Sequence, residues 1–381
     1  MTSGTGIAFI GTGFVSDYYM TTLANHPQLH LRGVWDVDPS RLQQFCDYWK
    51  VKAYASEMDL LADPAIGIVV NLTPPESHQA VNRAALLADK HVYCEKPLAM
   101  TVEEARELVS LAAERGLTLA GAPANALSDA CGHCADILRS GIIGTPRLAY
   151  AEMEDGPVFR DKWQDWRSRS GAKWPAVHEF EIGCTLEHAG YAASWLVSLF
   201  GPVSNVAAFS ALTFPTKGPG TETLALGPDF SVGCLTFKSG LVARLTSGLA
   251  APRDRSLTIA GDKGTLVVRD LWDNRSPIHV ELSGTRRPLV HRLIERVEWQ
   301  FQRKFPFRLT AGKSVAYPQA APKNSLPKYP SQIDFVRGIA AQADAIKAGT
   351  RPVFSGETAL HLTDIVLALN AGKRDHTPTP L

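Results

Sequence analysis

The strongest constraint on the fold is a short apolar run that stops at two glycines near the start of the chain. Residues 7–10 are apolar, Gly11 and Gly13 follow, and residues from about 14 to 25 have the pattern of a helix. A strand, a glycine turn and a helix in this order are the context in which G-x-G-x-x-G/A/S binds a dinucleotide. Gly11 allows the tight turn, Gly13 lets the backbone approach a pyrophosphate, and Ser16 takes the third, small position.

The start of this helix is predicted to bind phosphate. Free N–H groups and the positive end of the helix dipole are available to an anion there. We therefore expect the turn and the first helical residues to contact the cofactor, namely Gly11, Thr12, Gly13, Phe14 and Val15.

A second β-rich run ends in an acid. Residues 31–37 carry Asp36 near their end, where such units place a carboxylate that binds ribose hydroxyls. This carboxylate would repel a 2′-phosphate and so favours NAD, although Arg41 lies close enough to leave NADP possible. The alternative is that Asp36 only forms a turn, because Asp38, with Pro39 after it, is a helix-capping sequence.

Size and composition limit the class of protein. With 381 residues the chain can form two domains, and a net charge of +1 does not suggest a nucleic-acid surface. No apolar run is long enough for a bilayer, and the glycine motif begins too early for a targeting segment, so we expect a cytoplasmic protein without membrane attachment. The six scattered cysteines are expected to be reduced thiols. Cys131 and Cys134 have no matching second pair, so we expect no metal site.

Strand and helix patterns keep alternating through the first third of the chain. This alternation predicts a parallel, doubly wound α/β sheet, with a ligand beyond the carboxyl ends of its strands. We expect this dinucleotide-binding Rossmann domain to span residues 1–125. The expected helices are 39–50, 76–89 and 101–115, and the expected strands are 66–71, 91–94 and 117–121.

Two of these strand ends carry unusual residues that should face the crevice for a nicotinamide. Gly11-x-Gly13-x-x-Ser16, Thr73-Pro74-Pro75-x-x-His78 and Glu95-Lys96-Pro97, in this order and spacing, resemble the Gfo/Idh/MocA oxidoreductases. That family includes glucose–fructose oxidoreductase and the inositol dehydrogenases, and the resemblance extends through the whole chain. It implies NAD(P)-dependent hydride transfer.

The resemblance also implies cofactor contacts at both strand ends. These would come from Thr73, Pro74, Pro75, His78, Glu95, Lys96 and Asn125. His78 either contacts the nicotinamide ribose or caps its helix. Asn125 would contact cofactor or substrate, and Ala126 stands where an arginine is often found, which argues against an acidic substrate.

The remaining residues, 126–381, are expected to form a substrate-binding and oligomerisation α+β domain. Turns at 238–240 and 261–264 predict hairpins in a large, mostly antiparallel open sheet. Family members commonly associate through the exposed face of such a sheet, so we expect a homodimer or homotetramer. Residues 303–330 are expected to form an extended arm or loop, or alternatively a disordered connector, and 331–371 contain two closing helices. The expected strands are 147–154, 203–213, 229–238, 241–249, 255–260, 264–269 and 277–281.

A helix predicted over 184–200 carries polar candidates on one side. Glu187, His188, Tyr191 and Trp195 share a stripe opposite the apolar side, and Trp195 argues that this stripe faces a cleft. The family has a D-x-G-x-H/Y pattern here, which would place Glu187 on the acid and Tyr191 on the His/Tyr position. This chain departs from the family pattern in having Glu187 in place of Asp and Ala189 in place of Gly. An alternative alignment to the pattern, anchored on Trp195, would make His188 the catalytic group.

Lys96 is the expected catalytic acid/base. A dehydrogenase must remove the hydroxyl proton as hydride leaves, and a lysine does this near neutral pH only if its pKa is depressed. Glu95 would oppose that depression, so we expect it to point inward and orient the loop. Tyr191 would share the proton relay or bind a hydroxyl, and Glu187 would accept hydrogen bonds from vicinal hydroxyls.

Asp155 and the tryptophan-rich segment 163–174, which starts at Trp163, complete the predicted substrate site. Stacked tryptophans suit a carbohydrate or aromatic glycoside, although they could equally pack on their own core. The sequence thus predicts an NAD(P)-dependent oxidoreductase acting on a secondary alcohol or ketone of a sugar, cyclitol or glycoside. One alternative is glycoside cleavage by transient oxidation and elimination. The other, a non-catalytic dinucleotide-binding regulator, is disfavoured by the presence of Lys96.

Overall fold

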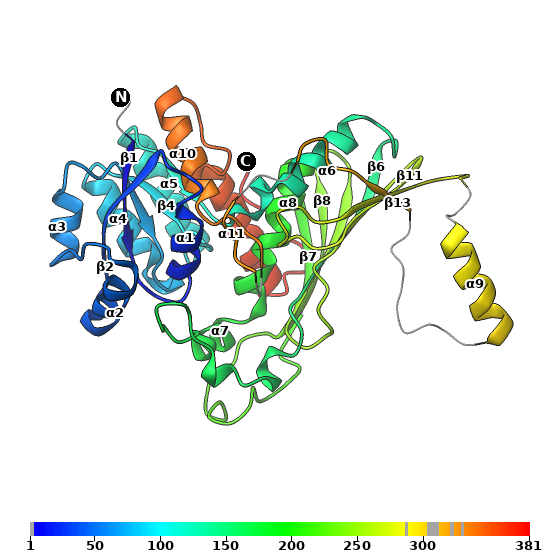
Figure 1. Cartoon of the computed structure of the whole chain (residues 1–381), viewed down its shortest axis with the longest axis horizontal. Helices are drawn as coiled ribbons and strands as arrows, with labels where there is room; N and C mark the ends of the chain where they lie inside the picture. Colours follow the sequence, from blue (N-terminus) through cyan, green and yellow to red (C-terminus); the bar gives the residue numbers. More distant parts are fainter. Residues whose placement is uncertain (1–3, 286–288, 303–311, 321–323, 329–330) are drawn as a thin grey trace.

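The computed structural model describes residues 4–285, 289–302, 312–320, 324–328 and 331–381. It contains two sheets with helices packed between and around them (Figure 1). The first is a five-stranded parallel sheet of order β2-β1-β3-β4-β5, which confirms the predicted doubly wound domain. Its strands are β1 (Thr5–Ile10), β2 (Leu29–Trp35), β3 (Ile68–Asn71), β4 (His91–Cys94) and β5 (Leu119–Gly121).

Local capping sequences explain where several helices of this domain begin. The Asp38 side chain caps α2 with Pro39 at the first position, and Thr101 with Glu104 forms a capping box at α5. No side chain caps the start of α1, the helix that follows the glycine turn. The helices are α1 (Ser16–Leu23), α2 (Pro39–Trp49), α3 (Glu57–Ala62), α4 (His78–Leu87) and α5 (Val102–Glu114).

The second sheet has eight strands in the order β13-β12-β11-β10-β6-β9-β8-β7. It is antiparallel except between β6 and β9, and the two predicted hairpins are present as β8–β9 and β10–β11. This confirms the mostly antiparallel sheet. Its strands are β6 (Pro146–Glu154), β7 (Val203–Ala211), β8 (Phe230–Phe237), β9 (Val242–Gly248), β10 (Leu257–Gly261), β11 (Gly264–Val268), β12 (Ile278–Leu282) and β13 (Lys313–Val315).

Helices cover one face of this sheet and join it to the Rossmann domain (Figure 1). The last helix, α11, packs on α5 as well as on α8 and β7, so the end of the chain contacts both sheets. Gln342 of α10 also donates to the backbone oxygen of Val92 in β4, 2.9 Å away. These helices are α6 (Asp129–Arg139), α7 (Ala176–Ile182), α8 (Gly190–Phe200), α10 (Arg337–Ala348) and α11 (Gly356–Asn370).

Three features differ from the sequence prediction. The helix expected over 184–200 is divided into a widened π turn, Thr185–Ala189, and the regular helix α8. Helices α3, α7 and α9 (Leu289–Phe301) were not expected. Within the predicted arm 303–330, β13 forms an edge strand, while residues 303–311, 321–323 and 329–330 lie outside the described part of the chain. Across the described ranges, no helix is long and apolar enough to cross a bilayer.

Candidate active site

The turn between β1 and α1 has the geometry required for a pyrophosphate. Gly11 has a φ of +99°, and a Cβ there would lie 2.6 Å from the Leu72 oxygen, whereas a Cβ on Gly13 would meet only open space. Ser16 Oγ donates a hydrogen bond to the Gly11 oxygen, 2.9 Å away, and this bond stabilises the turn. Because the start of α1 is uncapped, its N–H groups fit an anion.

Asp36 already has several partners within the protein. Its carboxylate accepts from Thr12 N at 2.7 Å and Thr12 Oγ1 at 2.9 Å, and from Arg41 Nη2 at 2.6 Å. Burial alone would raise the pKa of Asp36, but the hydrogen bond from Arg41 holds it below its usual range. Asp38 N also donates to Asp36, as the turn interpretation requires. Ribose binding by Asp36 therefore stays a prediction. It requires that the ribose hydroxyls donate to the Asp36 carboxylate, either together with Arg41 or in its place.

Replacing Asp36 with alanine should shift the cofactor preference toward NADP by at least about tenfold in kcat/KM, because it releases the Arg41 guanidinium for a 2′-phosphate. Steady-state kinetics with both dinucleotides would measure the ratio. Asp47→Ala, on the exposed side of α2, is the matched control and should leave the ratio unchanged. An unchanged ratio in Asp36→Ala would remove Asp36 from cofactor recognition.

His78 was predicted either to contact the nicotinamide ribose or to cap its helix, and in this structure its ring lies against the backbone of two loops. It is fully buried, with Nδ1 2.6 Å from the Pro97 oxygen and Nε2 2.9 Å from the Thr73 oxygen. Both ring nitrogens lie beside backbone oxygens, and the neutral imidazole donates to one of them at a time. Burial lowers the pKa of His78. The residue ties the loop after β3 to the loop after β4, where Thr73 and Pro75 are partly exposed and Pro74 is exposed.

Glu95 points inward, as expected. Its Oε1 accepts from the Tyr19 hydroxyl at 2.7 Å and its Oε2 from the Lys96 backbone N–H at 3.0 Å. The side chain thus orients the loop that carries Lys96. A direct contact between Glu95 and the cofactor stays a prediction, because both of its oxygens already have protein partners.

Lys96 meets Glu187 between the two sheets. Nζ lies 2.6 Å from Glu187 Oε2, and both side chains are largely buried. Burial by itself would lower the pKa of Lys96, but the neighbouring Glu187 charge outweighs it and raises that pKa above its usual range. The same pairing lowers the pKa of Glu187 against the effect of burial. The pairing therefore favours the ammonium form of Lys96, and the depression of its pKa by the positive charge of an oxidised nicotinamide stays a prediction.

Tyr191 lies beside this ion pair. The ring centroid is 5.7 Å from Lys96 Nζ, and burial raises the pKa of the phenol. Trp272 packs edge-on against Tyr191, with 4.8 Å between ring centroids. Trp272 was missed by the sequence analysis, because it comes from the loop between β11 and β12 and carries no motif.

His188 forms a second polar contact at the site. Its Nε2 lies 3.1 Å from Asp155 Oδ2, and Arg255 Nη1 approaches the other oxygen of Asp155 at 3.7 Å. Burial lowers the pKa of His188. Its buried Nδ1 has no hydrogen-bond partner among the described residues and can accept a proton. Asp155 orients His188 in this structure, and substrate binding by Asp155 stays a prediction.

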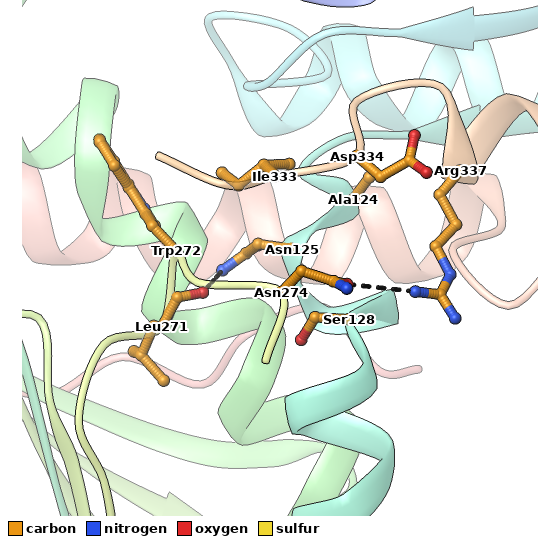
Figure 2. A pocket seen from close by; sticks show the side chains of 9 residues that line it. All are labelled: Ala124, Asn125, Ser128, Leu271, Trp272, Asn274, Ile333, Asp334 and Arg337. Atoms are coloured by element: carbon orange, nitrogen blue, oxygen red, sulfur yellow. Dashed lines mark hydrogen bonds between the residues drawn. The ribbon is translucent and has the colours of Figure 1, made fainter. Parts of the chain in front are cut away.

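Three residues predicted to line the site are buried elsewhere. Asn125 is 2% exposed, and its amide donates to the Tyr191 oxygen at 3.0 Å and the Leu271 oxygen at 3.2 Å. Figure 2 shows Asn125 directed at the backbone oxygen of Leu271, in a small pocket that Trp272 also lines. Asn125 therefore positions the Tyr191 and Trp272 segments, and a direct contact between Asn125 and a ligand stays a prediction. That pocket is lined by Ala124, Asn125, Ser128, Leu271, Trp272, Asn274, Ile333, Asp334 and Arg337.

The two tryptophans are also buried away from the site. Trp163 packs edge-on against Phe180 in a small apolar cluster and donates Nε1 to the Lys217 oxygen, so it does not line the substrate site. Trp195 is fully buried in the main core rather than facing a cleft. Spacing the residues at 100° around the helix therefore predicted the wrong surroundings for Trp195. The reason is that packing, and not the pattern of polar residues along the helix, decides which side of it is covered.

The site also contains a carboxyl group that the sequence analysis missed. Glu179 of α7 lies close enough to Glu187 and Lys96 for their charges to affect its pKa. Burial has the largest effect and raises this pKa well above its usual range.

Cys131 and Cys134 lie in α6, and the described residues contain no group of three or more His, Cys, Asp or Glu side chains that could hold a metal.

Glu154, at the end of β6 next to Asp155, should make stability depend on pH. Burial raises the pKa of Glu154 from 4.5 to about 7. Between these pH values the folded protein therefore keeps a proton that the unfolded chain has already released. The resulting stability is complete below about pH 4.5 and is lost as pH rises to about 7. Glu154→Gln should therefore raise the melting temperature more at pH 8 than at pH 5, with exposed Glu222→Gln as control. Equal shifts at both pH values would contradict the buried titration.

The fold and site together define a class of protein. A parallel dinucleotide-binding sheet, joined to an open mixed sheet with a lysine and a carboxylate meeting between them, is the architecture of a two-domain NAD(P)-dependent oxidoreductase. The chain belongs to the Gfo/Idh/MocA oxidoreductase family. Residues 5–121 match the model of the oxidoreductase family, NAD-binding Rossmann fold, and residues 133–267 match the GFO/IDH/MocA C-terminal domain.

Relatives place the chain among enzymes of this family. It is 42% identical over 230 residues to 1,5-anhydro-D-fructose reductase from Ensifer adhaerens, covering 59% of this chain and 63% of that protein. Its fold is similar to that of levoglucosan dehydrogenase in complex with NADH and levoglucosan, with a TM-score of 0.74, 18% identity and 97% of each chain covered. It is also similar to aldose-aldose oxidoreductase from Caulobacter crescentus, with a TM-score of 0.73, 18% identity and coverage of 98% and 99%.

Proposed function

We propose that this protein transfers hydride between a nicotinamide dinucleotide and a secondary alcohol or ketone of a neutral sugar, cyclitol or glycoside. The observation that carries the proposal is the buried Lys96–Glu187 pair, with Tyr191 and His188 beside it. We also propose that residues 1–125 and 126–381 act as the cofactor and substrate domains. The nicotinamide, when bound, supplies the hydride acceptor or donor.

The residues of the site can move a proton in either direction. Toward reduction, the Lys96 ammonium donates a hydrogen bond to the ketone oxygen and gives up its proton as that oxygen becomes a hydroxyl. Toward oxidation, Lys96 must first lose a proton. The unpartnered Nδ1 of His188 is the group that can accept a proton in this step, whereas Glu187, 2.6 Å from Lys96, stabilises the ammonium form. Asp155 holds the imidazole in place for this role.

The charges at the site support a neutral polyhydroxyl substrate. Glu187 beside Lys96 and Asp155 beside His188 are carboxylates, and a carboxylate accepts hydrogen bonds from vicinal hydroxyls. An anionic sugar would be repelled by the same groups. The name of the relative 1,5-anhydro-D-fructose reductase points to the same class of substrate.

The first experiment is a spectrophotometric screen of polyols, sugars and glycosides with NAD and with NADP. Net formation of the reduced dinucleotide with a neutral polyol or sugar supports the proposal. Glycoside cleavage without accumulation of reduced dinucleotide would favour oxidation and elimination instead. Tight dinucleotide binding with no turnover on any substrate would favour the regulator and contradict the proposed activity.

We further propose that the protein is a homodimer or homotetramer that associates through the uncovered face of its eight-stranded sheet. Leu148, Tyr150, Phe209 and Val242 are large side chains exposed on strands of this sheet. Apolar patches of this kind mark interaction surfaces. Light scattering would measure the assembly, and a strict monomer at micromolar concentration would contradict it.

A further inference from the structure

The loop that carries Lys96 is held at its far end by a side chain from the last helix. This lysine loop comprises residues 95–98, which directly follow β4. Thr363 of α11 accepts a hydrogen bond through Oγ1 from the Leu98 backbone N–H, 3.0 Å away. Thr363 is 3% exposed and Leu98 is 2% exposed. Because a buried N–H is costly to leave unpaired, this hydrogen bond fixes the end of the loop.

The rest of the lysine loop is held by groups of the Rossmann domain. Glu95 Oε2 accepts from the Lys96 N–H at 3.0 Å, and the Pro97 oxygen lies 2.6 Å from His78 Nδ1. Thr363 differs from these partners because α11 also packs on β7 and β8 of the second sheet. The hydrogen bond from Leu98 to Thr363 therefore fixes the backbone of the loop relative to the second sheet.

The same helix contacts the segment that carries Glu187. α11 packs on the π turn Thr185–Ala189 and on α8. The lysine loop, the π turn and α11 meet around one small pocket. Its lining includes Lys96 and Leu98 from the loop, Leu186 from the turn, and Leu362 and Thr363 from α11. α11 thus lies against both segments that supply the Lys96–Glu187 ion pair.

Hydrogen bonds on either side of Thr363 fix α11 itself. His361 Nε2 accepts from the Val203 N–H of β7, 3.0 Å away. Asp364 Oδ2 accepts from the Thr379 N–H near the end of the chain, 2.7 Å away. Because both neighbours are bound in this way, the Thr363 hydroxyl has a fixed position, and the lysine loop must adapt to it.

We propose that Thr363 is a positioning residue for the reaction: through Leu98 it sets the lysine loop so that Lys96 Nζ is correctly placed relative to Glu187 and the substrate oxygen. This role rests on the proposed function, because Thr363 acts only through Lys96. A displacement of about 1 Å in an active site can lower the rate by about a hundredfold. The hydroxyl of Thr363 should therefore affect turnover although it lies behind the loop.

The first test removes the hydroxyl. Thr363→Val keeps the branched side chain and should lower kcat by about tenfold to a hundredfold, while dinucleotide affinity changes little because the glycine turn is untouched. Thr363→Ser keeps the hydroxyl and should keep kcat close to wild type, whereas Thr363→Ala should behave like Thr363→Val. Steady-state kinetics, with the neutral sugar or polyol that gives most turnover in the screen, and titration with NADH and NADPH would measure both quantities. Wild-type kcat in the Val and Ala variants, or an equal loss in the Ser variant, would overturn the proposal.

A matched control separates positioning from a general loss of stability. Thr221 is also buried, at 1% exposed, and its Oγ1 accepts from the Lys217 N–H at 2.8 Å. Thr221→Val therefore makes the same chemical change at a distance from Lys96. It should lower the melting temperature about as much as Thr363→Val but leave kcat unchanged. An equal loss of kcat in both variants would overturn the role of Thr363.

A double variant tests whether Thr363 acts through Lys96. In the Lys96→Ala background, Thr363→Val should not lower the residual turnover further, because the group that it positions is absent. If the two losses multiply, Thr363 acts by another route and the proposal is wrong. If Lys96→Ala alone retains wild-type turnover, the proposed function fails and the role of Thr363 fails with it.

Crystal structures of the variants give a readout that needs no substrate. The separation of Lys96 Nζ and Glu187 Oε2 should lengthen in Thr363→Val and stay at 2.6 Å in Thr363→Ser. An unchanged separation in Thr363→Val would overturn the positioning role even if Lys96 proves essential for turnover.

Discussion

Replacing Lys96 with alanine should lower kcat by about 10²- to 10⁴-fold, because the proton donor and acceptor for the substrate oxygen is lost. Dinucleotide affinity should change little, since the glycine turn and Asp36 are untouched. Steady-state kinetics and dinucleotide titration on the same preparation would measure both quantities. Turnover close to wild type would exclude Lys96 from the mechanism.

A folding control is needed because Lys96→Ala leaves Glu187 buried without its partner. The double variant with Glu187→Gln removes that uncompensated charge. It should restore the melting temperature but not kcat. If it instead recovers activity, the loss in Lys96→Ala was structural.

Two further variants separate the neighbouring groups. Tyr191→Phe keeps the ring packed on Trp272 and removes only the hydroxyl, whereas His188→Gln removes the group held by Asp155. The variant that changes the pH dependence of kcat identifies the group that exchanges a proton with Lys96.

Replacing Lys217 with methionine should destabilise the protein by about 3–5 kcal/mol, lowering the melting temperature by roughly 10 °C. Lys217 is 1% exposed and donates to Asp229 Oδ2 and to the Phe214 oxygen, each at 2.7 Å. Its removal leaves the Asp229 carboxylate buried without a countercharge. Thermal unfolding would measure the change.

Two comparisons make this result specific. Lys263→Met, at an exposed turn, should leave the melting temperature nearly unchanged. Adding Asp229→Asn to Lys217→Met should recover part of the lost stability, because the unpaired charge is removed. If Lys217→Met alone changes the melting temperature only slightly, water must reach Asp229 and solvate its charge in place of Lys217.

The Rossmann half was predictable because its signals are local. Alternating strands and helices, the glycine turn and the caps at Asp38 and Thr101 each act within a few residues, and β4 begins and ends where expected. Lys96 was predictable for a related reason. Parallel strands all end at one edge, so a residue just after β4 faces the crevice whatever the rest of the chain does.

The sequence by itself determined the two sheets, the family resemblance and the position of Lys96, since periodicity and turn chemistry depend on near neighbours. Only the tertiary structure decided which polar atoms meet: His188 with Asp155, Lys96 with Glu187, and Trp272 against Tyr191. It also gave the polar atoms of His78 and Asn125 backbone partners within the protein. Burial and hydrogen-bond partners are set by packing between distant segments, and no local pattern records that packing.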